Sequence, residues 1–352
     1  MARDVRLVGF HVRHRKGLKW RRQLRQESWG PLTVYEIPSF LPLKILGYFL
    51  VPFWEAKKVK RNYGKPQVFH LHVSYPYAIF SLPIRFLNIP YWVISEHWSG
   101  FVIEKKNYLS PLLYWLLRYS IKSFDAVLTV SEYLKKRLIE KFPLISNKKV
   151  LIIQNPIKFP DRPPPCPDCG DKTFRFLTIG NLVDSLKNIS FLLKAFAELS
   201  KNFPQTHLDV VGDGPDRTSL EQLAKDLGID HKVCFHGAVP NENIYTFYER
   251  CHAFVLFSRF ETFSIATAEA LSHGRPVVVS DCGAPAEYIN DISGVLVPQD
   301  NLETAVEGLK KIINYYHKYD PEKIYNYAKS LFNNETARLK ILEVYKTSSN
   351  NF

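Results

Sequence analysis

Two successive series of alternating strands and helices, separated by a proline-rich segment, constrain the fold of this 352-residue chain most strongly. In the first half we predict strands at residues 5–10, 33–37, 68–73, 91–95, 126–130 and 150–153, and helices at 110–123 and 131–142. In the second half we predict strands at residues 175–179, 207–211, 232–236, 252–257, 276–280 and 294–297, and helices at 188–200, 216–227, 241–251 and 302–319. Such alternation favours α/β domains with parallel sheets.

The proline-rich segment at residues 156–171 indicates the domain boundary. We therefore predict two doubly wound, Rossmann-like domains, one at residues 1–157 and one at 174–320, joined by a linker at 158–173. We expect a helix at residues 321–352 to cross back to the first domain. Two such domains place a ligand in the cleft between them, at the carboxyl ends of the strands.

The net charge of +13 is concentrated in the first half. Residues 1–157 hold 26 Lys/Arg and 9 Asp/Glu, a net charge of +17, whereas residues 158–352 carry −4. Such a domain attracts an anionic membrane, a phosphorylated lipid or nucleic acid. The basic run at residues 11–25 accompanies no nucleic-acid-binding module, so we favour a solvated or membrane-facing surface and expect no nucleic-acid partner.

The apolar segments are too short to span a bilayer, which needs about 20 residues. Residues 40–54 form the longest, interrupted by Pro42, Lys44 and Pro52 and followed by a basic run at 57–61. This segment could lie in a membrane interface or form an ordinary core helix, and the sequence leaves both interpretations open.

The chain contains five cysteines: Cys166, Cys169, Cys234, Cys251 and Cys282. An odd number of cysteines and no recognisable secretory signal favour a cytoplasmic location. Cys166 and Cys169 have the spacing of half a zinc knuckle, but no second pair follows at a suitable distance. We therefore interpret them as an incidental pair and predict no metal site.

Glu261 and Glu269 are the strongest functional signal in the chain. They flank the start of a predicted helix that follows a buried strand and ends near Gly274 and Pro276. A helix N-terminus presents free amides and a partial positive charge, which suit a diphosphate. Carboxylates on either side of it can accept hydrogen bonds from sugar hydroxyls. The pattern is therefore typical of a nucleotide-sugar pocket.

The second half resembles retaining glycosyltransferases of family four, which have the GT-B architecture. The resemblance extends from about residue 174 to 309 and depends on an ordered set of motifs: TIGNL at 178–182 followed by Lys187 and Asn188, VVGDGP at 210–215, VCFHGAV at 233–239, the Glu-x7-Glu element, and GRPVV at 274–278. The first half matches more loosely, through HLH at 70–72, SEHWSG at 95–100, VS at 130–131 and QNP at 154–156.

The resemblance implies roles for matching positions only. His97, Glu261 and Lys187 would be the catalytic residues: His97 and Glu261 would contact the transferred sugar, and Lys187 would neutralise the diphosphate. The donor-binding residues would be Gly180, Asn181, Lys187, Gly237, Val239, Phe263, Ser264 and Glu269. Glu269 would hold the ribose, and Gly237 and Val239 would lie beside the base. We also interpret His72 as facing the cleft and His70 as structural, on opposite sides of one strand.

The resemblance also implies a reaction and its partners. The donor would be a UDP- or GDP-sugar and the acceptor a glycan or lipid-linked saccharide of cell-surface polysaccharide synthesis. No cofactor or metal ion is expected, because the family works without one and no convincing Asp-x-Asp motif is present. The basic first domain favours a peripheral position on the inner face of the cytoplasmic membrane.

Three positions depart from the family pattern. Asn181 stands where Arg is usual, so Arg259 or Arg275 would have to supply the missing cation. Ser264 stands where Gly is usual. The first domain is expected to lack its first strand and helix, because the chain enters the family pattern late. The late start and Asn181 keep open the alternative of a truncated, non-catalytic nucleotide-sugar-binding paralogue. A GT-B nucleotide-sugar epimerase or phosphorylase also fits the architecture.

Overall fold

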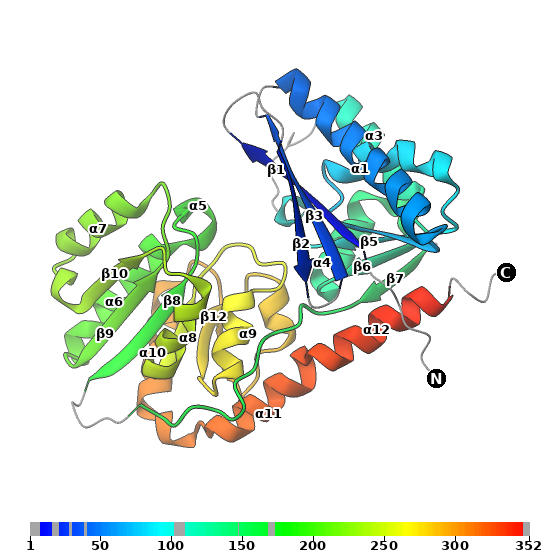
Figure 1. The fold of residues 1–352 in the computed structure, drawn as a ribbon. Helices are drawn as coiled ribbons and strands as arrows, with labels where there is room; N and C mark the ends of the chain where they lie inside the picture. The colour runs from blue at the N-terminus through cyan, green and yellow to red at the C-terminus, as the bar shows by residue number, and fades with distance from the viewer. Residues whose placement is uncertain are drawn as a thin grey trace.

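The computed structural model describes residues 8–15, 21–27, 30–38, 41–101, 110–146, 148–167 and 173–347. They form two α/β domains joined by an extended segment (Figure 1). Each domain contains a parallel sheet flanked by helices, which is the predicted fold class.

The C-terminal domain is built on a six-stranded parallel sheet of order β10-β9-β8-β11-β12-β13. Its strands are β8 (Phe174–Ile179), β9 (Thr206–Val211), β10 (Val233–Gly237), β11 (Ala253–Leu256), β12 (Val277–Ser280) and β13 (Gly294–Val297). The core strands are continuous apolar runs, because both faces of a doubly wound sheet are buried. Every prediction of a strand in this half is therefore confirmed, within a few residues at the ends.

Helices cover both faces of this sheet. One face packs against α6 (Ile189–Asn202), α7 (Arg217–Asp226) and α10 (Leu302–Asn314). The other packs against α8 (Asn241–Arg250), α9 (Ile265–Ser272) and α11 (Pro321–Phe332). The short helices α5 (Asp184–Lys187), η5 (Asp230–Lys232), η6 (Ala284–Glu287) and η7 (Tyr316–Lys318) lie in the connections. Side chains alternate between the faces along each strand, so neighbouring residues such as Val210 and Val211 enter different core clusters.

The N-terminal domain has a four-stranded parallel sheet of order β4-β5-β6-β7. Its strands are β4 (Val68–His72), β5 (Tyr91–Glu96), β6 (Ala126–Thr129) and β7 (Lys149–Ile152), as predicted. The helices of this domain are α1 (Leu41–Tyr63), α2 (Tyr77–Ser81), η1 (Leu82–Leu87), η2 (Ser99–Phe101), α3 (Pro111–Lys122), α4 (Glu132–Lys141) and η3 (Pro143–Ile145).

A separate three-stranded sheet precedes α1 and corrects two predictions. It consists of β1 (Gly9–Arg15), β2 (Arg21–Glu27) and β3 (Gly30–Pro38), with β3 in the centre. The described first strand, Gly9–Arg15, overlaps the prediction at residues 9–10 and extends beyond it, while residues 5–7 lie outside the described residues. Strand β2 was not predicted. Because β2 has the sequence RRQLRQE, its hydrophobic pattern is weak, and pairing with β3 determines its conformation.

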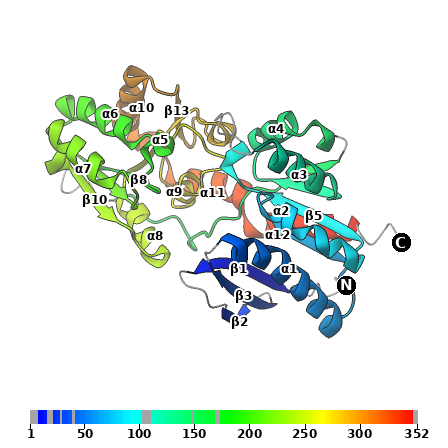
Figure 2. The same ribbon diagram turned by 90° about the horizontal axis from the view of Figure 1, so that it is seen from above.

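The C-terminal end of the described chain lies against the N-terminal domain. After α11, helix α12 (Asn334–Thr347) runs along that domain in both views (Figures 1 and 2). Ala337 and Val344 join a core cluster with Val93 and Leu128, and the Tyr345 hydroxyl lies 2.5 Å from Nδ1 of His70. This packing couples the last helix to the strand that leads into the candidate site.

The proline-rich segment is extended and held at several points. The Ile157 amide donates to the Phe332 carbonyl at 3.1 Å, and the Tyr325 hydroxyl donates to the Pro160 carbonyl at 2.9 Å. Cys166 is exposed, while Cys169 lies outside the described residues. Among the described residues, we find no helix that is both long and apolar enough to pass through a bilayer.

Candidate functional site

The two domains meet at the carboxyl ends of their parallel sheets. Ser131, at the start of α4, donates from Oγ to the Thr262 carbonyl at 2.8 Å, and Thr262 Oγ1 donates to the His97 carbonyl at 3.3 Å. The Glu287 carboxylate accepts from the amides of Glu132, at 3.0 Å, and Tyr133, at 2.5 Å. These contacts bring His97 of the first domain beside the loop that carries Glu261.

Lys187 and Glu261 form an ion pair at this interface, with Nζ and Oε1 2.6 Å apart. The Ser258 hydroxyl donates to the same oxygen at 2.9 Å. The Glu261 backbone is fixed by hydrogen bonds with Cys282 and Ala284 on the next strand connection. The lysine side chain is 26% exposed and the glutamate side chain 11% exposed, so the pair lies at the edge of solvent. The sequence predicted both residues, and the structure adds that they contact each other directly.

Lys187 is positioned by a short helix with well-defined polar contacts. It ends α5, after which Asn188 adopts a left-handed conformation with φ of 54°. Asp184, at the start of α5, accepts from the Ser190 amide and hydroxyl. Gly180 lies beside the lysine, because a Cβ at Gly180 would be 3.5 Å from Lys187 Cε.

Helix α9 presents its N-terminus next to this ion pair. Ser264 caps the helix, accepting from the Thr267 amide at 3.4 Å, and has φ of 68°. That conformation is the one in which glycine is usual, so the departure at Ser264 keeps the backbone shape and adds a capping hydroxyl. Phe263 is buried against Tyr288 and Phe332, so only its backbone can face a ligand.

Glu269 lies one turn inside α9, where its Oε2 is 3.0 Å from the Tyr248 hydroxyl. Burial raises the pKa of this carboxyl, and the hydrogen bond from Tyr248 opposes that effect. Tyr248 comes from α8 and is fully buried. Sequence reasoning missed it, since a tyrosine on an amphipathic helix looks like any core residue.

Three glycines make the strand ends of β8, β9 and β10 approach closely. The Gly212 amide donates to the Gly237 carbonyl at 2.9 Å, and a Cβ at Gly212 would lie 1.8 Å from the Gly180 oxygen. The three glycines therefore form a surface of bare backbone that a planar group can approach closely. Arg217 of α7 borders it, because a Cβ at Gly237 would be 2.7 Å from Arg217 Nη1. Val239 follows Gly237 and is half-buried. Arg217 was not predicted and lies just after the VVGDGP motif.

The structure separates the two arginines proposed to replace a cation at Asn181. Asn181 is exposed after β8. Arg259 is partly exposed and braces α5, donating from Nη1 to the Asp184 carbonyl at 3.2 Å. Arg275, in contrast, is 0% exposed and donates to the carbonyls of Tyr248, Glu249 and Pro165. The expectation for Arg275 is therefore wrong: its guanidinium holds backbone and linker together inside the domain.

His97 belongs to a row of three imidazoles in the N-terminal domain. The ring centroids of His70 and His72 are 4.5 Å apart, and those of His72 and His97 are 6.0 Å apart. The expectation that His70 and His72 face opposite sides is therefore wrong, since positions two apart in a strand share a face. His70 Nε2 lies 2.7 Å from Ser95 Oγ, which agrees with a structural role. Burial lowers the pKa of His97 to about 4, although a hydrogen bond with Asn155 opposes it.

Glu96 organises the loop before His97 and was also missed. Its buried carboxylate accepts from the amides of Ser74, His97 and Trp98 at 3.0, 2.9 and 2.7 Å, and from the Ser74 hydroxyl. Burial raises the pKa of this carboxyl, and these hydrogen bonds lower it. The sequence signal that could have identified Glu96 is its position, a glutamate at the end of a buried strand.

We predict that the histidine row makes the protein less stable in acid. Burial lowers the pKa of His70 to about 3, with smaller contributions from His72 and His97, whereas an unfolded histidine titrates near 6.5. The free energy of unfolding should therefore be fully maintained above pH 6.5 and should fall as the pH approaches 4, by up to about 1.4 kcal/mol per pH unit for each such histidine.

Urea unfolding of wild type and His70→Gln between pH 4.5 and 7.5 tests this expectation. The variant should show a shallower loss of stability with falling pH. The exposed His231 provides the matched control, and His231→Gln should keep the wild-type slope. An unchanged slope in His70→Gln would contradict the assigned burial effect.

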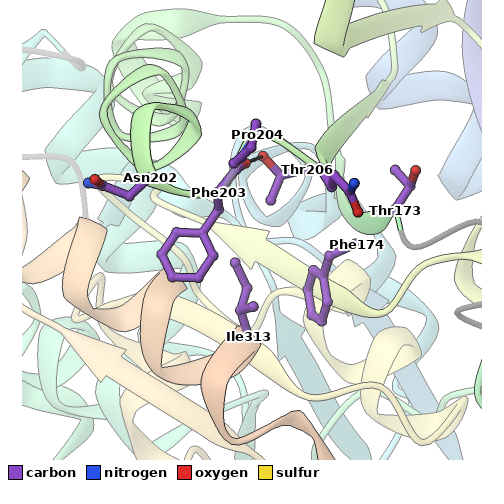
Figure 3. A pocket seen from close by; sticks show the side chains of 8 residues that line it. Thr173, Phe174, Asn202, Phe203, Pro204, Thr206 and Ile313 are labelled. Carbon is purple, nitrogen blue, oxygen red and sulfur yellow. Dashed lines mark hydrogen bonds between the residues drawn. The ribbon is translucent and has the colours of Figure 1, made fainter.

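A cavity in the described part of the C-terminal domain lies away from this site. It has a volume of about 380 Å³ and lies at the amino ends of β8 and β9 (Figure 3). Its lining residues are Thr173, Phe174, Asn202, Phe203, Pro204, Gln205, Thr206 and Ile313. The candidate site is at the opposite, carboxyl edge of the same sheet, where parallel α/β sheets bind ligands.

Family models match both halves of the chain. The model for glycosyl transferases group 1 matches residues 169–331, and the model for glycosyltransferase family 4 matches residues 4–159. The two matches together include all the predicted site residues.

Curated relatives are glycosyltransferases of several kinds. An N-acetylgalactosamine-N,N'-diacetylbacillosaminyl-diphospho-undecaprenol 4-alpha-N-acetylgalactosaminyltransferase of Campylobacter jejuni is 30% identical over 275 residues, which are 76% of this chain and 73% of the relative. A lipopolysaccharide 1,6-galactosyltransferase of Escherichia coli is 29% identical over 205 residues, 57% of this chain and 55% of the relative. The matches to glycosyltransferases of Haemophilus influenzae and Bacillus subtilis cover 61% and 53% of those proteins.

Solved structures share the fold at low sequence identity. A lipopolysaccharide outer core galactosyltransferase, WaaB, superposes with a TM-score of 0.65 and 20% identity over 90% of this chain and 83% of its own. Anabaena HepE in complex with UDP and glucose has a TM-score of 0.70 and 16% identity over 89% of this chain and 86% of its own.

Proposed function

This chain belongs to the glycosyltransferases of group 1 and family 4, and from that membership we propose that it is a retaining enzyme that transfers a sugar from a UDP- or GDP-sugar to an acceptor hydroxyl. The observation that carries the proposal is the Lys187–Glu261 ion pair beside the N-terminus of α9. A cation and helix amides suit a diphosphate, and the carboxylate suits the hydroxyls of the sugar attached to it. HepE, which shares the fold, was crystallised with UDP and glucose.

In this proposal each side chain acts on one part of the donor. Glu261 accepts hydrogen bonds from the transferred sugar, and Lys187 neutralises the charge that grows on the departing diphosphate. Glu269 holds the ribose, while the base lies beside Gly237 and Val239. His97 contacts the sugar from the first domain as a neutral hydrogen-bonding group, because burial lowers its pKa to about 4.

We propose that transfer proceeds without a metal ion. The leaving diphosphate then depends on Lys187 and on the first amides of α9 for stabilisation, which is electrostatic catalysis by preorganised groups. The leaving phosphate oxygen removes the acceptor proton as the new bond forms on the same face. Glu261 and His97 therefore position and stabilise the sugar, and neither acts as a nucleophile.

A panel of UDP- and GDP-sugars with purified protein in EDTA tests this function. Thermal stabilisation by one donor, together with slow release of its nucleotide, is expected. Loss of both in Lys187→Met would connect them to the site. Failure of every donor to bind would favour the non-catalytic alternative, and strict dependence of turnover on added Mg²⁺ or Mn²⁺ would refute metal-independent transfer.

The proposed acceptor is a lipid-linked saccharide at the inner face of the cytoplasmic membrane. The Campylobacter relative's name includes a diphospho-undecaprenol acceptor, and the Escherichia coli relative acts on lipopolysaccharide. The net charge of +17 on residues 1–157 is complementary to anionic lipid and to a pyrophosphate.

An exposed apolar layer on the N-terminal domain supports membrane contact. Helices α1 and α3 both pack against α2, and η1 packs against α1, so the four elements form one layer. Trp54 is 58% exposed, Phe86 83% and Trp115 59%. Further exposed apolar residues on α1 and α3 are Ile45, Leu46, Leu50, Leu112 and Tyr119. Aromatic and aliphatic side chains are typical of helices that lie in a bilayer interface.

Basic residues flank this apolar layer. Lys57, Lys60 and Arg61 are exposed at the end of α1, and Arg118 and Lys122 are exposed on α3. Glu55, the acidic residue of α1, is buried and contacts Tyr35, Arg22 and Lys58. The surface therefore combines insertion of apolar groups with attraction to anionic headgroups.

We predict that Trp54→Ala combined with Trp115→Ala weakens binding to vesicles rich in phosphatidylglycerol at least tenfold. Cosedimentation at low and high salt measures this. Because both side chains are exposed, the fold should be unaffected, and Leu339→Ala on α12 provides an exposed apolar control. Equal binding by the double variant, or equal binding to neutral phosphatidylcholine vesicles, would contradict the proposed surface.

A further inference from the structure

Four potential metal ligands lie together on two neighbouring strands of the C-terminal sheet. They are His207 and Asp209 of β9 and Cys234 and His236 of β10. Residues two apart in a strand project to the same face, and the register pairs Cys234 with Asp209. The parallel pairing therefore brings two side chains from each strand onto one patch.

The ligand atoms of this patch are already close to one another. Nε2 of His236 lies 2.6 Å from Oδ1 of Asp209, and Nε2 of His207 lies 3.6 Å from the same oxygen. Sγ of Cys234 lies 3.9 Å from Nδ1 of His236. One ligand atom from each of Asp209, Cys234 and His236 falls within 4.8 Å of the others. Ligand atoms of a tetrahedral zinc ion are roughly 3.3–3.8 Å apart, given its bond lengths, so the His236 ring must turn until one of its nitrogens faces both the Asp209 oxygen and the Cys234 sulfur.

We propose that Asp209, Cys234 and His236, with His207 as the fourth ligand, bind a zinc-class divalent cation. Thiolate and imidazole ligands favour Zn²⁺ and related transition metals over Mg²⁺ and Ca²⁺, which prefer oxygen atoms. One thiolate and one carboxylate together neutralise a divalent charge. Cys234 and His236 are exposed, which gives the ion a route of entry.

The alternative is a hydrogen-bonded chain in which Asp209 joins the two histidines. That chain explains the short Asp209–His236 contact and leaves the sulfur only a long contact with His236 Nδ1, at 3.9 Å, whereas a metal site uses all four side chains. Phe247 of α8 packs its ring at 4.7 Å from the His236 ring and limits the imidazole orientation. Fixed ligand orientation is a requirement of a metal site.

The metal site would stabilise the edge of the sheet next to the proposed base-binding surface. Gly237 directly follows His236, and Gly212 follows β9 by one residue and donates to the Gly237 carbonyl. A cation that joins β9 to the edge strand β10 would therefore fix the spacing of these two glycines. This role is structural and separate from sugar transfer.

Titration of metal-free protein with Co²⁺, followed by competition with Zn²⁺, tests the site. We expect one equivalent to bind with a sulfur-to-cobalt charge-transfer band, which Zn²⁺ abolishes. Cys234→Ser should remove the band, and His236→Gln should weaken Co²⁺ binding at least tenfold. Circular dichroism in EDTA verifies that each variant is folded.

Cys166→Ser is the matched control. Cys166 is another exposed thiol, and together with Cys169 it has the spacing of half a zinc knuckle. The band should persist in this variant. Absence of stoichiometric Co²⁺ or Zn²⁺ binding, or a band that survives Cys234→Ser and disappears in Cys166→Ser, would overturn the proposal.

Discussion

Replacement of Glu261 by Gln is expected to lower kcat/KM for sugar transfer by about two to three orders of magnitude while leaving the fold intact. Gln keeps the size of the side chain and can still accept from Ser258, but it removes the charge that faces Lys187. Loss of one preorganised electrostatic group costs about 10²–10³-fold in comparable sites. Glu261 is largely buried, but Lys187 is 26% exposed and Gln still accepts from Ser258, so the free energy of unfolding should fall by no more than about 1–3 kcal/mol. Nucleotide release and glycosylated acceptor are the quantities to measure.

A double-mutant cycle with Lys187→Met measures how far the effect of Glu261→Gln depends on the contact with Lys187. Because the two residues touch, their effects should be strongly non-additive, with the double variant less impaired than the product of the single effects. Glu303→Gln, an exposed carboxylate in the first turn of α10, is the control and should retain wild-type turnover. Wild-type turnover in Glu261→Gln would remove this residue from the proposed site.

The second domain was easier to predict from sequence than the first. Strands such as β11 and β12 are apolar runs that are buried on both faces, and turn residues mark their ends. Strand β2 carries no such pattern, because six of its seven residues are charged or polar and its pairing with β3 comes from tertiary structure. A local sequence pattern therefore predicts a strand only where burial restricts the strand to apolar residues.

The site residues were named from motifs, but their contacts were not predictable. Lys187 and Glu261 are 74 residues apart, and their ion pair arises because β8 and β11 are neighbours in the sheet. Ser264 is a case in which local reasoning was informative, since a position that favours glycine does have positive φ. Arg275 is the opposite case. Its partners are backbone carbonyls, which every residue has, so the sequence does not indicate which of them the guanidinium contacts.

That burial makes Arg275→Met the substitution expected to affect stability most. The guanidinium is fully buried and bonds to the carbonyls of Tyr248, Glu249 and Pro165. Met fills much of the volume but leaves these carbonyls without their present donors, and a buried polar group without a partner costs about 1–3 kcal/mol. We expect the free energy of unfolding to fall by about 3–5 kcal/mol, as measured by urea denaturation.

The contact with Pro165 gives this prediction a second, independent measurement. Pro165 belongs to the linker, so its release in Arg275→Met should make residues around 160–167 more susceptible to limited proteolysis than in wild type. Arg250→Met supplies the matched control, because that arginine is exposed on α8 and its loss should cost less than about 1 kcal/mol. A variant at Arg275 with near-wild-type stability and an equally protected linker would show that the guanidinium is dispensable to both. Loss of stability with an unchanged cleavage rate would limit its role to the interior of the C-terminal domain.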